Sequence, residues 1–276
     1  MNIIAIDIGN STIKIALFIG DVEKFIESVG GADDNARTRI AELLESAWAQ
    51  IPWIKNAKVK KRDGVIVASS VKPAWTEMVS AICSEKLDEK IRLIGRDVPL
   101  PIDTAVDDSM QVGTDRLVAA AAAYAVTQNA VVIADVGTAV TIDLVDEDGL
   151  FMGGVIYPGF DITATALQQG TARLPKVTVS KPKGCYGANT VDAINCGLYY
   201  GVIGLLETII RRYAEELGFW PQTILTGGAS SLIKDDCDFI DSWVSDLTVR
   251  GVVVAYKKYL AEQEFPANDD DGNKGK

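Results

Sequence analysis

A short phrase occurs twice in this chain. Asp7-Ile8-Gly9-Asn10-Ser11, near the start, returns as Asp135-Val136-Gly137-Thr138-Ala139 in the second half. Each copy closes an apolar run and leads into a second apolar run, so each predicts a strand, a tight turn and another strand. In both, an aspartate stands at the end of the first strand. The repeat therefore predicts two related units, each built around its own sheet.

The chemistry of the repeated turn points to phosphate. A glycine lets backbone N–H groups approach an anion without a Cβ in the way, and an aspartate beside it can hold a cation or a water. Asx-type turns use the same residues for geometry alone, but two copies at matching places favour phosphate binding. Two such hairpins facing each other across a cleft would bind a nucleoside triphosphate from both sides. This pattern indicates a phosphoryl-transfer enzyme.

The order of predicted elements indicates the fold class. Each half begins with three successive strands and continues with alternating helices and strands, a pattern typical of the ribonuclease H-like domain shared by actin and sugar kinases. We expect an α/β protein with two such domains, mixed five-stranded sheets flanked by helices, and an inter-domain cleft. The 276 residues are enough for two domains. The expected division is residues 1–114, residues 115–265 and a polar, acidic, disordered tail over 266–276.

Composition excludes several classes of function. The net charge of −11 argues against a nucleic-acid partner. The four cysteines follow no metal-binding spacing, so we expect them to be buried or half-buried in a reducing cytosol. No basic leader precedes the first strand and no apolar stretch is expected to reach membrane-spanning length, which predicts a cytoplasmic protein without a membrane partner. The chain has no histidine, so a general base must be a carboxylate, Lys, Tyr or Cys.

Two further motifs are candidates for the site. Gly113-Thr114-Asp115-Arg116 opens an alanine-rich helix, where Asp115 is either a helix-start charge that favours the macrodipole or a catalytic base. We expect Asp115 and Arg116 to form a carboxylate–guanidinium pair at the mouth of the cleft. The pairs Gly153-Gly154 and Gly227-Gly228 mark close approach of another backbone or a ligand. The second pair follows a buried strand and suits an adenosine that passes close to the main chain.

Together these residues resemble the type III pantothenate kinase family, in the actin-like kinase superfamily, from Asn2 to about Lys257. Seven phrases carry the resemblance in the family's order. They are Asp7–Ser11, Gly113–Arg116, Asp135–Asp143, Gly153–Gly159, Thr171–Pro175, Gly187–Thr190 and Thr226–Gly228.

The resemblance implies ATP-dependent phosphorylation of the primary hydroxyl of pantothenate, the first step toward coenzyme A, by a cytoplasmic homodimer. It implies that Asp115 is the proton acceptor and that Asp135 holds a monovalent cation, potassium or ammonium. From the residues alone, Asp135 would be a magnesium-side carboxylate, and Mg²⁺ is also expected with ATP. The implied ATP-binding residues are Asp7, Ile8, Gly9, Asn10, Ser11, Thr12, Ile13, Lys14 and Thr138. The implied pantothenate-binding residues are Gly113, Thr114, Asp115, Arg116 and Thr190, with the partner subunit as one source of Thr190.

One departure and two alternatives stay open at this stage. Val106 stands where the family commonly has a tyrosine, which leaves room for a different small hydroxylated acceptor. A sugar- or acetate-type kinase would keep both hairpins but lack the Gly113–Arg116 and Thr171–Pro175 phrases. A non-enzymatic accessory factor that affects transcription is the other alternative, against which the acidic charge argues.

The homodimer is also suggested by a long helix predicted from Thr190. Its apolar residues exceed what one face needs to cover a sheet. They are Ile194, Leu198, Tyr199, Val202, Leu205, Leu206 and Ile209.

Overall fold

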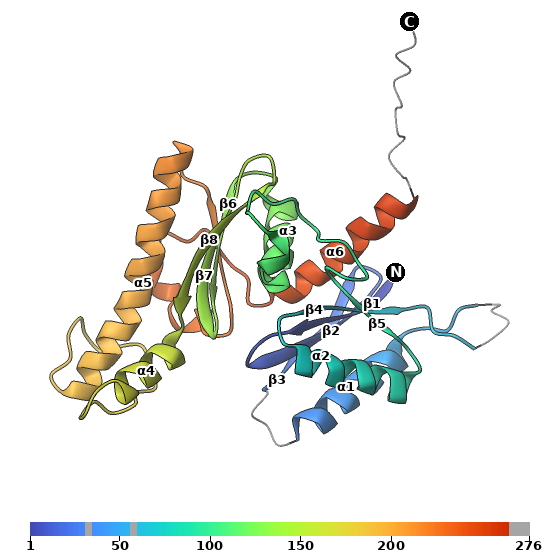
Figure 1. The fold of residues 1–276 in the computed structure, drawn as a ribbon, viewed down its shortest axis with the longest axis horizontal. Helices are drawn as coiled ribbons and strands as arrows, with labels where there is room; N and C mark the ends of the chain where they lie inside the picture. The colour runs from blue at the N-terminus through green and yellow to red at the C-terminus, as the bar shows by residue number, and fades with distance from the viewer. Residues whose placement is uncertain (31–34, 56–59, 265–276) are drawn as a thin grey trace, which may run out of the picture.

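The computed structural model describes residues 1–30, 35–55 and 60–264. Two five-stranded sheets stand side by side, with two helices between them and further helices on their outer faces (Figure 1). The expected α/β class with two mixed five-stranded sheets is confirmed. The tail predicted over 266–276 lies outside the described residues.

The first sheet has the strand order β3-β2-β1-β4-β5. The central strand β1 pairs antiparallel with β2 and parallel with β4, and both faces of β1 are buried. A strand buried on both faces reads as a continuous apolar run, which is why Ile3 to Ile6 show no alternation. Its strands are β1 (Asn2–Ile8), β2 (Thr12–Ile19), β3 (Val22–Gly30), β4 (Val65–Ser70) and β5 (Ile91–Leu93).

The second sheet repeats this topology. Its order is β10-β9-β6-β7-β8, so the central β6 pairs antiparallel with β7 and parallel with β9, as β1 does with β2 and β4. The sequence repeat therefore corresponds to a structural repeat. Its strands are β6 (Val131–Val136), β7 (Ala139–Val145), β8 (Phe151–Pro158), β9 (Gln222–Thr226) and β10 (Ser242–Trp243).

Four helices cover the outer faces. The first sheet is covered by α1 (Ala36–Gln50) and α2 (Pro73–Ile82), which bury Leu44 and Trp48 among others. A π-helical segment over Cys83–Leu87 extends α2. On the second sheet, α4 (Phe160–Gln169) and α5 (Thr190–Leu217) bury residues such as Phe160 and Tyr199.

The helices between the sheets connect the two units. Helix α3 (Thr114–Thr127) packs on the second sheet, whereas α6 (Leu247–Glu264) packs on the first, through Val249 and Val252 among others. Helices α3 and α6 cross at short distance, since the glycine at 251 leaves no space for a side chain: an added Cβ would lie 2.1 Å from the Val118 carbonyl oxygen. The division at residue 114 stays a prediction, and α6 packs on the first sheet although it lies within the expected second range.

Two expectations about surface properties are wrong. By length and composition α5 is sufficient to cross a membrane, contrary to the expectation that no stretch reaches that length. One side of α5 packs on the second sheet through Leu198, Val202 and Leu206. A helix in a protein core can have the same length and apolar composition as a membrane-spanning helix. Cys185 is exposed, while the other cysteines are buried, because it lies in an irregular surface segment before α5.

Candidate functional site

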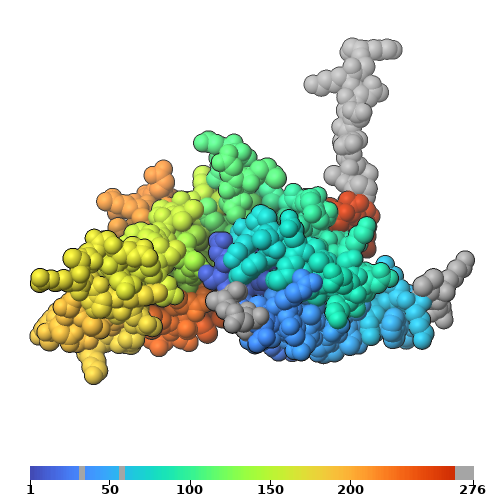
Figure 2. Space-filling view, turned by 60° about the horizontal axis from the view of Figure 1, so that its bottom comes forward, coloured from blue at the N-terminus to red at the C-terminus, as the bar shows by residue number. Residues whose placement is uncertain are grey.

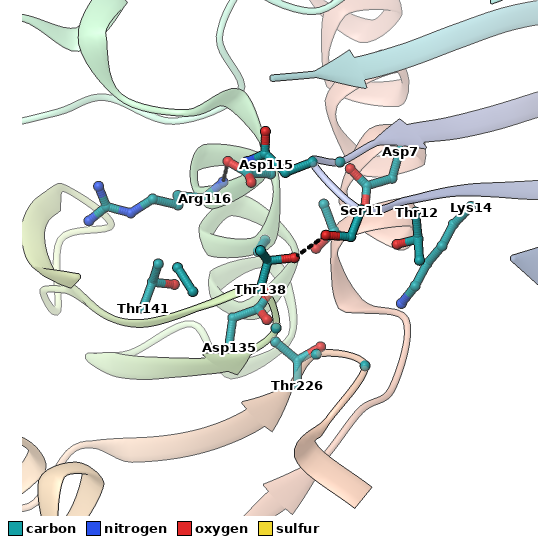
Figure 3. Close-up of a pocket in the computed structure, with 18 of the residues that line it drawn as sticks. Asp7, Ser11, Thr12, Lys14, Asp115, Arg116, Asp135, Thr138, Thr141 and Thr226 are labelled. Carbon is teal, nitrogen blue, oxygen red and sulfur yellow. Dashed lines mark hydrogen bonds between the residues drawn. The ribbon is translucent and has the colours of Figure 1, made fainter. Parts of the chain in front are cut away.

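The two repeated hairpins meet where the sheets face each other. In the first, the Gly9 N–H donates to the Thr12 carbonyl at 3.0 Å, and in the second the Gly137 N–H donates to the Ala139 carbonyl at 2.9 Å. The tips touch: Ser11 Oγ lies 2.7 Å from Thr138 Oγ1 (Figure 3). Figure 2 shows the dark blue N-terminal segment exposed at the junction between the cyan and yellow-green parts. The predicted facing arrangement is present.

A cleft that is partly open to solvent lies between the hairpins. Most of the sequence-predicted site residues line it. The lining includes Asp7, Gly9, Asn10, Ser11, Thr12, Lys14, Asp115, Arg116, Asp135 and Thr138, together with Ala119, Ile133, Gly137, Ala139, Thr141, Asp143, Thr226, Gly227, Gly228 and Thr248.

Five predicted residues lie outside this lining, as far as the described residues show. Ile8 and Ile13 are buried in the core of the first sheet, because alternate residues of a strand point to opposite faces. Gly113 and Thr114 stand at the start of α3, and Thr114 Oγ1 accepts the Ser70 N–H at 3.2 Å, which joins α3 to the end of β4. Thr190 is exposed at the start of α5.

Four aspartates come together in the cleft, from four different elements. Asp7 is the last residue but one of β1, Asp115 lies in the first turn of α3, Asp135 lies in β6 and Asp143 lies in β7. The Asp7 Oδ1 atom is buried and has no hydrogen-bond partner among the described residues. A buried polar atom without a partner costs free energy, and a cation or a ligand proton supplies the missing contact.

The electrostatics of these carboxylates follow from burial and mutual repulsion. Burial, followed by the charge of Asp115, raises the pKa of Asp7 to about 7, although Lys14 opposes the shift. The same two causes raise the pKa of Asp135 to about 6. Burial also raises the pKa of Asp115 above its ordinary value. Perturbed acids clustered in a cleft are typical of functional sites.

The predicted ion pair between Asp115 and Arg116 is wrong. The Arg116 Nε donates to both oxygens of Asp143, at 3.0 and 3.1 Å, and Nη2 contacts the same carboxylate. The Asp115 carboxylate instead accepts the backbone N–H of Arg116 at 2.8 Å. Successive residues of a helix point in different directions, so neighbouring side chains do not face each other. In Figure 3 the Arg116 side chain extends away from Asp115, on the side of Thr141.

Lys14 lines the cleft but is already paired. Its Nζ donates to the Ser245 carbonyl at 3.0 Å and to Asp246 Oδ1 at 3.1 Å, just before α6 begins. The lysine that the sequence assigned to phosphate therefore also connects β2 to the segment that leads into α6.

The sequence assigned no role to Asp143, although it flagged the glycines near it. The sequence does contain one signal for Asp143: it is a charged residue at an inward position of an otherwise buried strand. Gly227, singled out for close backbone approach, has φ +98°, and a Cβ there would lie 2.3 Å from Asp135 Oδ1. The glycine therefore makes room for the carboxylate of Asp135.

The comparisons with known proteins agree with this geometry. The profile of type III pantothenate kinases matches residues 3–212. A type III pantothenate kinase from Rhodospirillum rubrum is 32% identical over 257 residues, covering 93% of this chain and 98% of its own. One from Persephonella marina is 33% identical over 255 residues, covering 92% and 98%. This chain belongs to the type III pantothenate kinase family. Membership makes it a kinase, with ATP and pantothenate as substrates and a place in coenzyme A biosynthesis.

Solved structures support the fold. A candidate 2-dehydro-3-deoxygalactonokinase from Sinorhizobium meliloti is 14% identical with a TM-score of 0.55, covering 95% of this chain and 99% of its own. A candidate Baf family transcriptional activator from Campylobacter jejuni is 17% identical with a TM-score of 0.54, covering 96% and 99%. Component A of (R)-2-hydroxyglutaryl-CoA dehydratase from Acidaminococcus fermentans has a TM-score of 0.51 at 14% identity, covering 94% and 97%. At these identities the likeness concerns the fold alone.

The raised pKa of Asp7 predicts a pH-dependent stability. The folded protein keeps this proton up to about pH 7, whereas the unfolded chain loses it near pH 4, so this group lowers stability as pH rises between those values. Asp7→Asn should therefore raise the Tm of the ligand-free protein above pH 7. The rise should be about 2–4 °C for each kcal/mol by which the free energy of unfolding increases. The difference should shrink toward pH 4, as measured by thermal denaturation.

Asp97→Asn is the matched control of opposite sign. A hydrogen bond from Arg96 lowers the pKa of Asp97, so its contribution is present at neutral pH and lost in acid. This variant should lower the Tm slightly at pH 7, and the difference should shrink as the pH falls below the ordinary pKa of an aspartate. An unchanged or lower Tm for Asp7→Asn at pH 8 would contradict the prediction.

Proposed function

We propose that this chain transfers the γ-phosphoryl group of ATP to the primary hydroxyl of pantothenate in the cleft between the two hairpins, with Asp115 as the proton acceptor. The observation that carries this proposal is the position of Asp115. Its carboxylate stands at the start of α3, within a cleft lined by both phosphate-type turns. No histidine exists to replace it.

The hairpins supply what phosphoryl transfer needs most, which is positioning and neutralisation of charge. The Gly9–Thr12 turn and Thr138 offer backbone N–H groups and hydroxyls to the ATP phosphates. The hydroxyls of Ser11 and Thr138 bond each other in the ligand-free cleft, and each can exchange that bond for a phosphate oxygen. Gly227 and Gly228 would lie beside the adenosine.

Asp115 suits the role of base. Burial raises the pKa of Asp115, which makes its carboxylate a stronger proton acceptor than a solvated one. As the acceptor oxygen forms its bond to phosphorus, the bond to the ADP oxygen breaks and the hydroxyl proton passes to Asp115. The N–H of Arg116 keeps the carboxylate oriented meanwhile.

The donor atoms in the cleft also fit cations. The unpartnered Asp7 Oδ1 is an oxygen ligand suited to magnesium or to one of its waters. Asp135 is a single carboxylate beside a backbone turn, suited to a large, weakly hydrated monovalent ion. Among the described residues, no three acidic or cysteine side chains form a complete metal site, so a cation there needs ligands from backbone, water or ATP. Bound Mg²⁺ would neutralise phosphate charge.

The test of the base is Asp115→Asn. It keeps the size of the side chain and its bond to the Arg116 N–H but removes the proton acceptor, so kcat with pantothenate should fall about 10²–10⁴-fold. ATP binding should persist, since the hairpins hold the nucleotide. The measurement is steady-state kinetics together with ATP binding by calorimetry.

Asp108→Asn is the control. Like Asp115, Asp108 accepts a backbone N–H near the start of a helical segment, in this case a short one. Unlike Asp115, Asp108 does not line the cleft. It should leave kcat unchanged. A nearly wild-type kcat for Asp115→Asn would make Asp115 a structural residue, and a wild-type protein with no pantothenate turnover would favour another acceptor or the accessory-factor alternative.

We propose that Asp135 makes turnover depend on a monovalent cation. Activity in potassium or ammonium buffer should exceed activity in sodium-only buffer, and Asp135→Asn should remove that difference. Asp161→Asn, on the exposed first turn of α4, should preserve it. Equal wild-type activity in sodium and potassium would contradict this assignment.

We propose that the protein is a homodimer, but the original reason for it does not hold. The seven apolar residues of α5 named above all pack into the core of the second sheet or against it.

The exposed side of α5 instead carries small residues at helical spacing: Ala193, Gly197, Gly201 and Gly204. Nothing lies within 4 Å of a Cβ placed at these three glycines. This side could accept another helix at short distance, which would bring Thr190 toward the partner's cleft.

Gly201→Leu tests this surface. Because nothing in the same subunit lies within 4 Å of the added Cβ, the fold should be kept, whereas close helix contact between subunits should be lost. Light scattering at micromolar concentration should show a dimer for the wild type and a monomer for the variant. Glu216→Leu, an exposed change farther along α5, should remain dimeric. A monomeric wild type would overturn the proposal.

A further inference from the structure

Among the ion pairs of the described residues, the one between Arg116 and Asp143 is the most deeply buried. Both of its residues line the cleft. The Arg116 side chain is 15% exposed and that of Asp143 is 3% exposed. Both Asp143 oxygens accept from Nε, and Nη2 contacts the same carboxylate. A bidentate pair of this kind determines the plane of the guanidinium, which a single hydrogen bond does not.

The neighbouring residues are shaped around this pair. Gly154 lies opposite Asp143 in the register of β7 and β8, and a Cβ there would lie 2.3 Å from Asp143 Oδ1. Any other residue at 154 would displace the carboxylate. On the other side, the guanidinium carbon of Arg116 lies 5.5 Å from the centre of the Phe151 ring. Arg116 is therefore held by a carboxylate and an aromatic ring.

The remaining donors of Arg116 are available to a ligand. A guanidinium has five N–H donors, and Asp143 engages the Nε side and Nη2. Among the described residues no hydrogen bond engages Nη1, so its two hydrogens remain, on a side chain that lines the cleft. Donors held in one orientation in a partly dehydrated cleft suit a carboxylate or amide oxygen, and their fixed orientation lowers the entropy lost on binding.

We propose that Asp143 is a positioning residue for the acceptor substrate: it orients Arg116 so that its free donors bind an oxygen-bearing group of that substrate. The inference rests on the proposed function, since it concerns the acceptor of the same transfer. Asp143 acts through Arg116 and touches no reacting atom. It should therefore set the affinity for the acceptor and leave ATP binding alone.

The first variant is Asp143→Asn. The amide cannot form the charged fork, so the orientation of Arg116 should be lost. Loss of hydrogen bonds to a charged group corresponds to roughly tenfold or more in affinity, so KM for pantothenate should rise about 10–100-fold. KM for ATP should stay within about twofold of the wild type. Arg116→Lys should show the same split, because an ammonium cannot make the bidentate contact.

Two further variants keep the test decisive if Asp143→Asn does not fold. Gly154→Ala leaves both charged residues in place but pushes the Asp143 carboxylate and also the backbone of β7, because its Cβ would lie 2.4 Å from the Ile142 carbonyl oxygen. In a folded variant that binds ATP normally, it should also raise KM for pantothenate selectively. Its control, Gly30→Ala, adds a methyl where nothing lies within 4 Å and should change neither KM. Arg116→Met with Asp143→Leu removes both charges together, which a buried site tolerates better than the loss of one.

The double variant should bind ATP normally and should raise KM for pantothenate as much as Arg116→Met alone. This non-additivity would show that Asp143 acts through Arg116. An unchanged KM for pantothenate in Asp143→Asn or Gly154→Ala would overturn the inference, and so would an equal rise in both KM values. A wild type that phosphorylates no pantothenate would overturn the proposed function itself, whereas an active wild type with these unchanged values would overturn only this inference.

Discussion

The site depends on the burial of carboxylates that form no ion pair among the described residues. Asp7, Asp115 and Asp135 come from different elements and meet where two sheets face each other. Removing them from water raises their pKa values, and their mutual repulsion adds to the shift for Asp7 and Asp135. Such an arrangement is unfavourable in the empty protein. A ligand that supplies positive charge or a proton would lower this cost, so under the proposed function the same feature that lowers stability would favour ligand binding.

The fourth aspartate shows the contrast. Asp143 is also buried, but Arg116 meets both of its oxygens, and Gly154 leaves space for it. A buried charge with a bidentate partner is a structural element of the cleft wall, whereas a buried charge without one is available for chemistry. From this difference we propose separate roles for residues of the same type: Asp143 orients Arg116, whereas Asp7, Asp115 and Asp135 face the ligands.

Sequence reasoning predicted the hairpins well because the signals are local. An apolar run, an aspartate, a glycine and a second apolar run specify a strand–turn–strand without reference to distant residues. It failed for Arg116, whose partner lies 27 residues away on another element, and for the seven apolar residues of α5, which the second sheet uses in full. In each case the error concerns a contact between residues far apart in the chain.

What the sequence determined by itself was the repeated unit, the glycine turns, the lack of histidine and the motif order shared with the family. These depend on residue types and short spacings. Only the tertiary structure decided that Ser11 touches Thr138, that Asp7 Oδ1 has no hydrogen-bond partner among the described residues, and that Arg116 pairs with Asp143 rather than with its neighbour. The physical reason is that burial and charge pairing are properties of the packed chain. A carboxylate has the same identity in any sequence, but its pKa and its partner arise only when the sheets and the crossing helices bring the separate strand ends together.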